Sequence, residues 1–145
     1  MFRFRLQHVL EIRERLERIK QKDYSLALLE AQRMEHEIAA RKVDIRRSGD
    51  HMDALRQSSP SAFPLQLHVN YRKRLDGEIL RLGESLNEHQ QVLEARRREM
   101  VEARRARRTM EILRDKAQAR YEQRLSRRER ADMDEVAANY HTFKA

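Results

Sequence analysis

The chain has 145 residues, of which 39% are charged and 39% hydrophobic, and its formal net charge at pH 7 is +8. Its 3 Gly and 2 Pro are too few for the turns of a β-sheet protein, and good helix formers dominate instead. The absence of cysteine excludes disulfides, thiolate zinc sites and cysteine nucleophiles. The composition predicts an all-α protein with a narrow apolar seam rather than a compact globule.

The first predicted helix covers about residues 3–57. Its apolar residues mostly follow one another at steps of three or four, as expected for one face of a helix. A step of five after Ile19 interrupts the heptad repeat. The predicted face consists of Phe2, Leu6, Val9, Ile12, Leu16, Ile19, Tyr24, Leu28, Ala31, Met34, Ile38, Ile45, Met52 and Leu55.

A single break follows at about residues 58–64, which include both prolines of the chain. Proline removes a backbone donor and disfavours helix at the preceding residue, so the first helix should end here. Ser61 is a candidate N-cap for the next helix. The apolar residues beside the break are expected either to close this end as a small cluster or to bind a partner; they are Phe63, Leu65, Leu67, Val69 and Tyr71.

The second predicted helix covers about residues 65–140. If the chain folds back at residue 61, residue i faces residue 122 minus i to within about a turn, and the two apolar faces meet. We therefore predict one domain over residues 1–145, a long antiparallel two-helix coiled-coil hairpin. The apolar face of the second predicted helix consists of Leu75, Ile79, Leu82, Leu86, His89, Leu93, Met100, Ala103, Met110, Leu113, Ala117 and Tyr121.

Because the second helix is the longer one, about 20 of its residues should extend past the N-terminus. No first-helix residues remain to cover the apolar side chains there, so this segment is expected to be either a partner surface or a frayed tail. These side chains are Leu125, Met133, Val136, Tyr140 and Phe143.

The positive charge is concentrated in residues 95–130, which hold 14 basic and 6 acidic residues. Three interpretations of this basic stretch are open: a solvated helix face with ion pairs, a docking surface for an acidic protein, and a nucleic-acid site. Nucleic acid is the least favoured, because the stretch lacks interleaved aromatic residues and matches no known reader module.

No catalytic pattern is found in the sequence. The glycines form no phosphate-binding loop, and no two histidines have the spacing of a metal site on a helix. Carboxylates on a slim hairpin are solvated, whereas a catalytic pair needs a cleft. We expect no enzyme activity, no cofactor and no metal.

Four stretches carry a resemblance to a known family: residues 2–10, 94–103, 107–113 and 128–137. In order and spacing they resemble the FliJ-type flagellar export proteins and the related stalk proteins of other type III secretion systems. The resemblance implies a coiled-coil stalk that binds the flagellar export ATPase ring and promotes its assembly and activity. It further implies contacts with the export-gate membrane protein and with substrate-specific export chaperones.

The resemblance also implies where the protein acts and which residues bind partners. It implies a cytoplasmic protein, held peripherally at the inner membrane by its partners, with no nucleic acid bound. The residues implied to face the ATPase are Phe2, Phe4, Leu6, Arg127, Arg128, Glu129, Met133, Asp134 and Glu135. Those implied to contact the gate, near the hairpin tip, are Val69, Asn70, Tyr71 and Leu75.

Two other functions fit the pattern of the residues. One is a generic structural coiled-coil adaptor or homodimer. The other, less favoured, is a basic coil that binds nucleic acid, whose affinity would fall steeply with salt.

Overall fold

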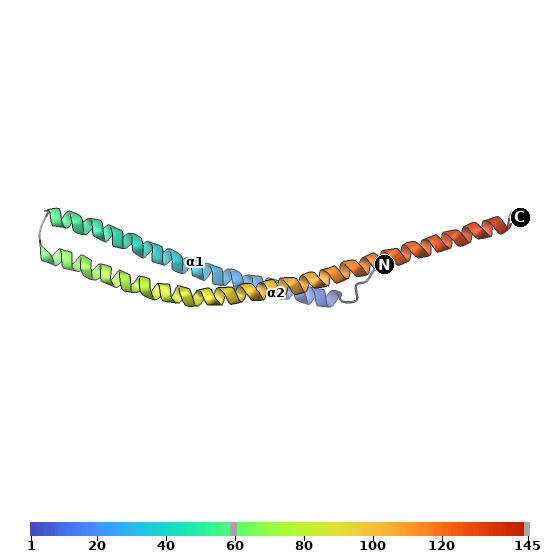
Figure 1. The fold of residues 1–145 in the computed structure, drawn as a ribbon, viewed down its shortest axis with the longest axis horizontal. Coiled ribbons are helices and arrows are strands. Elements are labelled where there is room, and N and C mark those ends of the chain that lie inside the picture. Colours follow the sequence, from blue (N-terminus) through green and yellow to red (C-terminus); the bar gives the residue numbers. More distant parts are fainter. Residues whose placement is uncertain (59–60, 144–145) are drawn as a thin grey trace. The chain divides into compact units, whose positions relative to one another are not determined.

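The structure, a computed structural model, describes residues 1–58 and 61–143, with side chains up to residue 139. These residues form two helices, α1 (Gln7–Ser58) and α2 (Ala62–Phe143), and contain no strand (Figure 1). The predicted all-α helical hairpin is confirmed.

The helix boundaries differ from the predicted ones by a few residues. Helix α1 begins at Gln7, whose backbone N–H donates to the Phe4 carbonyl (3.2 Å), so residues 1–6 lead into the helix. Helix α2 begins at Ala62, directly after Ser61, which shortens the expected loop. Pro64 therefore lies in the first turn of α2, where its missing N–H removes no helical hydrogen bond.

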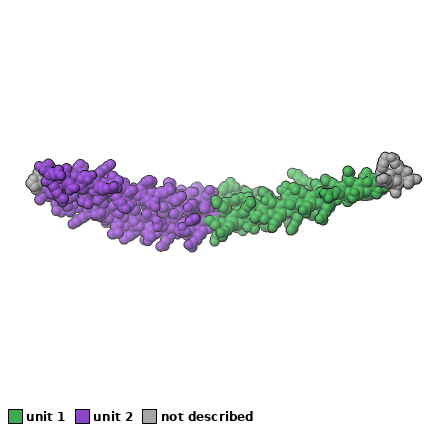
Figure 2. Space-filling model, turned by 45° about the horizontal axis from the view of Figure 1, so that its top comes forward, with its two compact units in different colours: residues 1–19, 101–145 green, residues 20–100 purple. Residues whose placement is uncertain are grey.

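The chain divides into two compact units, each containing part of α1 and part of α2 (Figure 2). Unit 1 consists of residues 1–19 and 101–145, and unit 2 of residues 20–100. The organisation of residues 1–145 as one domain stays a prediction.

In unit 2 the two helices run antiparallel, as four contacts between them show. The Nε2–H of His89 donates to the Ala27 carbonyl (2.8 Å), which places this histidine in the seam as predicted. The other contacts are Lys20–Glu99 (2.7 Å), Arg41–Glu78 (2.8 Å) and Ser48–His68 (2.9 Å). The residue numbers in these pairs add up to 116–119, so in unit 2 the register differs from the predicted 122 by three to six residues, or about one to two turns of helix.

The core of unit 2 is narrow and combines small and large side chains. Ala27, Ala31 and Met52 are buried on α1, and Leu75 is buried on α2. Ser48 is also buried, and its hydroxyl is within hydrogen-bond distance of His68, so burying this polar group carries no unpaired donor or acceptor.

In unit 1 the predicted apolar face of the first helix is wrong in part. Ile12 and Ile19 are 49% and 56% exposed, while Leu10, which was not assigned to the face, is 1% exposed. The side chain of Glu17 is only 13% exposed, although it is charged. The physical reason is that arginines of α2 pair with Glu17, so the seam here is partly ionic.

Candidate partner-binding surfaces

The N-terminal segment (residues 1–6) lies against α2 at Tyr121. The Met1 ammonium group donates to the Tyr121 hydroxyl (3.1 Å). The Phe2 ring packs on the Tyr121 ring with centroids 5.7 Å apart and the planes tilted by 51°. This tilted geometry is favourable for aromatic pairs, so both contacts hold the start of the chain on α2.

A shallow groove accompanies this segment. Phe2 and Phe4 are half-buried in it, and Leu6 is 41% exposed. Three arginines and one glutamate give it an excess of positive charge. Its lining residues are Phe2, Arg3, Phe4, Arg5, Gln7, His8, Glu11, Arg114 and Gln118.

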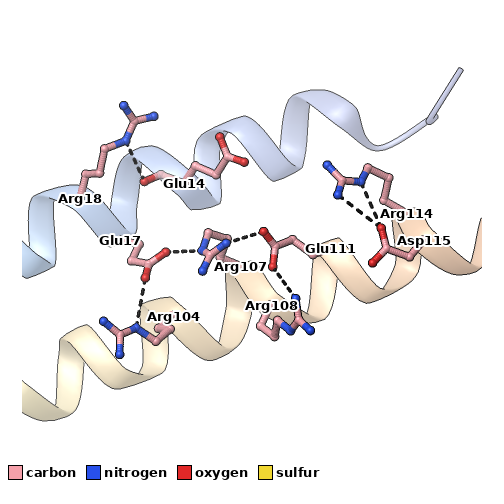
Figure 3. Close-up of polar contacts among 9 residues, drawn as sticks. All are labelled: Glu14, Glu17, Arg18, Arg104, Arg107, Arg108, Glu111, Arg114 and Asp115. Carbon is pink, nitrogen blue, oxygen red and sulfur yellow. Dashed lines mark hydrogen bonds and ion pairs between the residues drawn. The ribbon is translucent and has the colours of Figure 1, made fainter.

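An ion-pair network joins the two helices next to the groove (Figure 3). The Glu17 carboxylate accepts hydrogen bonds from Arg107 and from Arg104 (3.3 Å), both on α2. The Glu111 carboxylate accepts from Arg107 and from Arg108 (3.1 Å) on its own helix. Arg107 thus lies between two carboxylates, one from each helix.

The electrostatic consequence is seen at Arg107. Hydrogen bonding to Glu17 raises the pKa of its guanidinium above the usual value, with the charges of Glu17 and Glu111 adding to the effect. In unit 2, Arg96 and Arg97 also lie within 3.4 and 3.8 Å of the carboxylates of Glu99 and Glu94. These contacts favour the ion-pair interpretation of this part of the basic stretch over a nucleic-acid site.

The C-terminal segment (residues 122–139) extends α2 past Tyr121. Its apolar side chains are exposed: Leu125 by 44%, Met133 by 72% and Val136 by 66%. The charged residues predicted to bind a partner are exposed as well, namely Arg127, Arg128, Glu129, Asp134 and Glu135. The side chains of Tyr140 and Phe143 lie outside the described residues.

The structure brings the predicted ATPase-facing residues onto unit 1. Phe2, Phe4 and Leu6 lie in the N-terminal segment, and the others lie in the C-terminal segment that follows Tyr121. The two groups therefore lie on successive stretches of the same unit, with Tyr121 as the contact point of the first group.

The four residues predicted to contact the gate have different environments in unit 2. Asn70 is exposed and accepts a hydrogen bond from Gln66 (3.0 Å), and Tyr71 is 38% exposed. Val69 is half-buried. Leu75 is only 4% exposed, so it belongs to the core and not to the surface implied for it.

Sequence reasoning missed the exposed apolar residues on α1. Ile12 and Ile19 in unit 1 were assigned to the seam, and Leu26 and Leu29 in unit 2, which are 51% and 62% exposed, were not considered. A signal was present: steps of seven back from Ala31 give Tyr24, Glu17 and Leu10, which is the seam that the structure contains.

The described residues contain neither a metal-binding cluster nor a membrane-spanning helix. In that part of the chain, no group of three or more His, Cys, Asp or Glu side chains is placed to hold a metal ion. No helix among the described residues is long and apolar enough to cross a bilayer.

Comparison with known proteins gives one family match. A family model described as "Flagellar FliJ protein" matches residues 1–143. No curated protein and no solved structure matches the chain.

Proposed function

The chain belongs to the flagellar FliJ protein family, a family of export components, and from this premise we propose that it is a non-catalytic stalk of the flagellar type III export apparatus. In this role it binds the ring of the export ATPase and promotes the assembly and activity of the ring. The observation that carries the proposal is the C-terminal segment of α2, whose apolar side chains are exposed next to charged ones.

The chemistry of the C-terminal segment suits a protein partner. A helix that exposes apolar residues between charges gains by burying them in a partner, and its charges orient the encounter. Met133 and Val136 supply the apolar contact, while Arg127 and Arg128 supply the charge. The N-terminal segment adds Phe2 and Phe4 to the same unit.

The mechanism that we propose is mechanical coupling without chemistry on the stalk. A two-helix stalk is asymmetric, whereas the subunits of a ring are equivalent. Its contacts therefore differ from one subunit to the next, and a difference in contact free energy shifts the conformational equilibrium of each subunit. This requires exposed contact groups and a helix pair held in register, as Glu17 and its arginines hold it in unit 1.

Further partners follow from the family role. We propose that the export-gate membrane protein contacts the region around Val69, Asn70 and Tyr71, and that substrate-specific export chaperones bind elsewhere on the coil. Through these partners the protein would be cytoplasmic and peripheral to the inner membrane. The exposure of Asn70 and Tyr71 supports the gate contact.

The test is the ATPase rate of the cognate flagellar export ATPase at fixed salt, with and without the full chain. We expect the chain to raise the rate and to promote ring formation. The double variant Met133→Ser, Val136→Ser should lose most of the stimulation, because it removes apolar contact without touching the helix pair.

A matched control distinguishes loss of contact from loss of fold. Leu80→Ser removes an apolar side chain of similar exposure (65%) from α2 in unit 2, and should leave the stimulation unchanged. Helix content by circular dichroism should be the same for all variants. A rate that does not respond to the chain, together with no co-elution of chain and ATPase, would rule out the stalk proposal.

A further inference from the structure

The N-terminal segment lies beside α2 in unit 1, ahead of the first turn of α1 (Figure 1). Burial alternates along it, because Phe2 and Phe4 are half-buried whereas Arg3 and Arg5 are exposed. Such alternation is typical of an extended chain, in which successive side chains point to opposite sides. The two aromatic side chains therefore form the buried side of the segment.

The contact of this segment with α2 is centred on Tyr121. The Phe2 ring packs against the Tyr121 ring at a centroid distance of 5.7 Å. Arg114 and Gln118 lie two turns and one turn before Tyr121 on α2, and they line the same groove as Phe4. The segment thus follows α2 over its last turns before the C-terminal segment begins.

The N-terminal segment lengthens the part of α2 that is covered by the start of the chain. The residue numbers of the Glu17–Arg104 pair add up to 121, so Leu10, the first buried residue of α1, faces about residue 111. The Phe2 contact extends the covered part from there to Tyr121, which is about 10 residues or about 15 Å of helix. A covered helix resists bending better than a lone one, because bending it must also disturb its contacts.

We propose that Phe2 and Tyr121 form an aromatic clasp that positions the C-terminal segment of α2 for the export ATPase without contacting the ATPase itself. The clasp keeps the start of the chain on α2 as far as Tyr121. A force on the C-terminal segment then reaches the helix pair of unit 1 instead of bending a lone helix. This inference rests on the stalk function proposed above, and it makes Phe2 a positioning residue rather than a contact residue.

Exposure supports a positioning role for Phe2. Met133 and Val136 are 72% and 66% exposed, whereas Phe2 is half-buried with its ring on Tyr121. A side chain that already buries apolar area within its own chain has less of that area left to bury in a partner. Binding through Phe2 would also require its contact with Tyr121 to break first, and that cost would weaken the binding.

The first test is amide hydrogen exchange of the full chain alone, measured at Gln7 and Leu10 in the first turn of α1. Phe2→Ser should speed this exchange by about two- to tenfold, the range that the loss of one aromatic pair allows. Tyr121→Ser should also speed it, and the double variant should be no faster than Tyr121→Ser, because Phe2 has then already lost its partner. Tyr121→Phe should exchange more slowly than Tyr121→Ser, since it keeps the ring and loses only the hydroxyl.

The matched control is Ile112→Ser, which also replaces an apolar residue of α2 in unit 1, one that is 41% exposed. Ile112 lies about two and a half turns before Tyr121, so its side chain is on the opposite side of α2. Exchange at Gln7 and Leu10 should not change in this variant. If it speeds up as much as in Phe2→Ser, the effect is a general loosening of unit 1 and the proposal is overturned.

The second test measures stimulation of the export ATPase as a function of chain concentration. Phe2→Ser and Tyr121→Ser should each lower the maximal stimulation, while the concentration for half-maximal stimulation stays within about twofold, because the contact residues are intact. The double variant Met133→Ser, Val136→Ser should instead raise that concentration, because it removes contact area. Ile112→Ser should change neither quantity.

The possible failures are distinguishable. If Phe2→Ser raises the half-maximal concentration and Tyr121→Ser does not, Phe2 contacts the ATPase directly and the clasp proposal is overturned. Unchanged exchange at Gln7 and Leu10 in both variants would overturn it as well. A parent chain that never stimulates the ATPase would overturn the stalk function, and with it the coupling role of the clasp, even where the exchange result is as expected.

Discussion

Leu10 and Ile12 show how a single turn of helix separates core from surface in unit 1. Both are large aliphatic residues on α1, two positions apart, yet Leu10 is 1% exposed and Ile12 is 49% exposed. Among the described residues, Leu10 is the only large side chain that is less than 2% exposed. The packing of unit 1 therefore depends on it more than on any other apolar residue of α1.

We predict that Leu10→Ala lowers the free energy of unfolding by about 2 kcal/mol, at the low end for a buried leucine because a two-helix seam can partly close around the cavity. Ile12→Ala should cost less than about 1 kcal/mol, since half of its side chain is already in water. Urea unfolding monitored by circular dichroism measures both. Equal costs would mean that Ile12, as the apolar spacing suggested, belongs to the seam.

Glu17 occupies a seam position that an apolar residue would usually take. Its carboxylate is satisfied by Arg104 and Arg107, so the ion pairs replace the apolar contact that Ile19 was expected to make. Hydrogen bonds between charged groups depend on geometry far more than apolar contacts do, so this network also specifies which residues of α2 face Glu17. Register in unit 1 is therefore set in part by charge.

At the scale of elements, α2 contains two interior glycines that no contact requires. A Cβ atom at Gly77 or at Gly83 would meet no atom within 4 Å, and neither glycine has a positive φ. Neither glycine is therefore needed to let the other helix approach closely. Their main effect is the backbone entropy that glycine loses in a helix.

We predict that Gly77→Ala and Gly83→Ala each raise the free energy of unfolding by about 1 kcal/mol. The two gains should add in the double variant, because the positions are six residues apart on one helix and share no contact within 4 Å. Thermal and urea unfolding provide the measurement. A loss of stability in either variant would show that an alanine methyl meets something at that position.

The C-terminal segment of α2 stays helical beyond the contact of α2 with the N-terminal segment. Helix α2 continues to Phe143, well past the contact of Tyr121 with Met1. Good helix formers such as Ala, Arg and Glu dominate this segment, which favours helix even where tertiary packing does not contribute. The segment is thus prepared to bury one face in a partner.

At the scale of the molecule, contacts between α1 and α2 hold the hairpin in each unit. In unit 2, hydrogen bonding to Arg41 lowers the pKa of Glu78, and hydrogen bonding to Lys20 lowers the pKa of Glu99. A carboxylate whose pKa is lowered on folding stabilises the folded state above its unfolded pKa. That contribution is lost as the pH falls through the folded pKa, below the ordinary value of 4.5.

We predict that stability changes little between about pH 7 and pH 5 from these two groups and falls below about pH 4.5. Glu99→Gln should flatten the acid side of the profile, and Lys20→Gln should flatten it less, because Arg96 still pairs with Glu99. The double variant should be no flatter than Glu99→Gln. Urea midpoints across the pH range test this, and an unchanged acid limb in both single variants would contradict it.

The sequence predicted the fold of the hairpin correctly because its signals are local and repeated. The break at Pro60 and Pro64 separates two long periodic segments, and matching their apolar faces placed residue i opposite residue 122 minus i. The observed pairs in unit 1, Phe2–Tyr121 and Glu17–Arg104, agree with this to within a turn. The family resemblance from the same sequence is confirmed by the match over residues 1–143.

The candidate surfaces were predicted less completely. Exposure of Met133 and Val136 follows from helix lengths alone, because no first-helix residues remain to face them. Leu75 lies in the core, which contradicts its implied place on a surface. The sequence did not show which side of α2 faces α1, and this side decides whether Leu75 is buried. The roles of the predicted residues toward the export ATPase and the export gate stay predictions.

By itself, the sequence determined the class of fold, the position of the turn and the approximate register, because helix propensity, proline and apolar periodicity act over neighbouring residues. Only the tertiary structure decided which side chains form the seam. In unit 1 the choice between Ile19 and Glu17 depends on arginines about 85 to 90 positions away along the chain, Arg104 and Arg107. Steps of seven back from Ala31 do pass through Glu17, but periodicity within one helix does not say which arginines of the other helix pair with it. Burial of this charge in place of an isoleucine is therefore explained only when the two helices lie together.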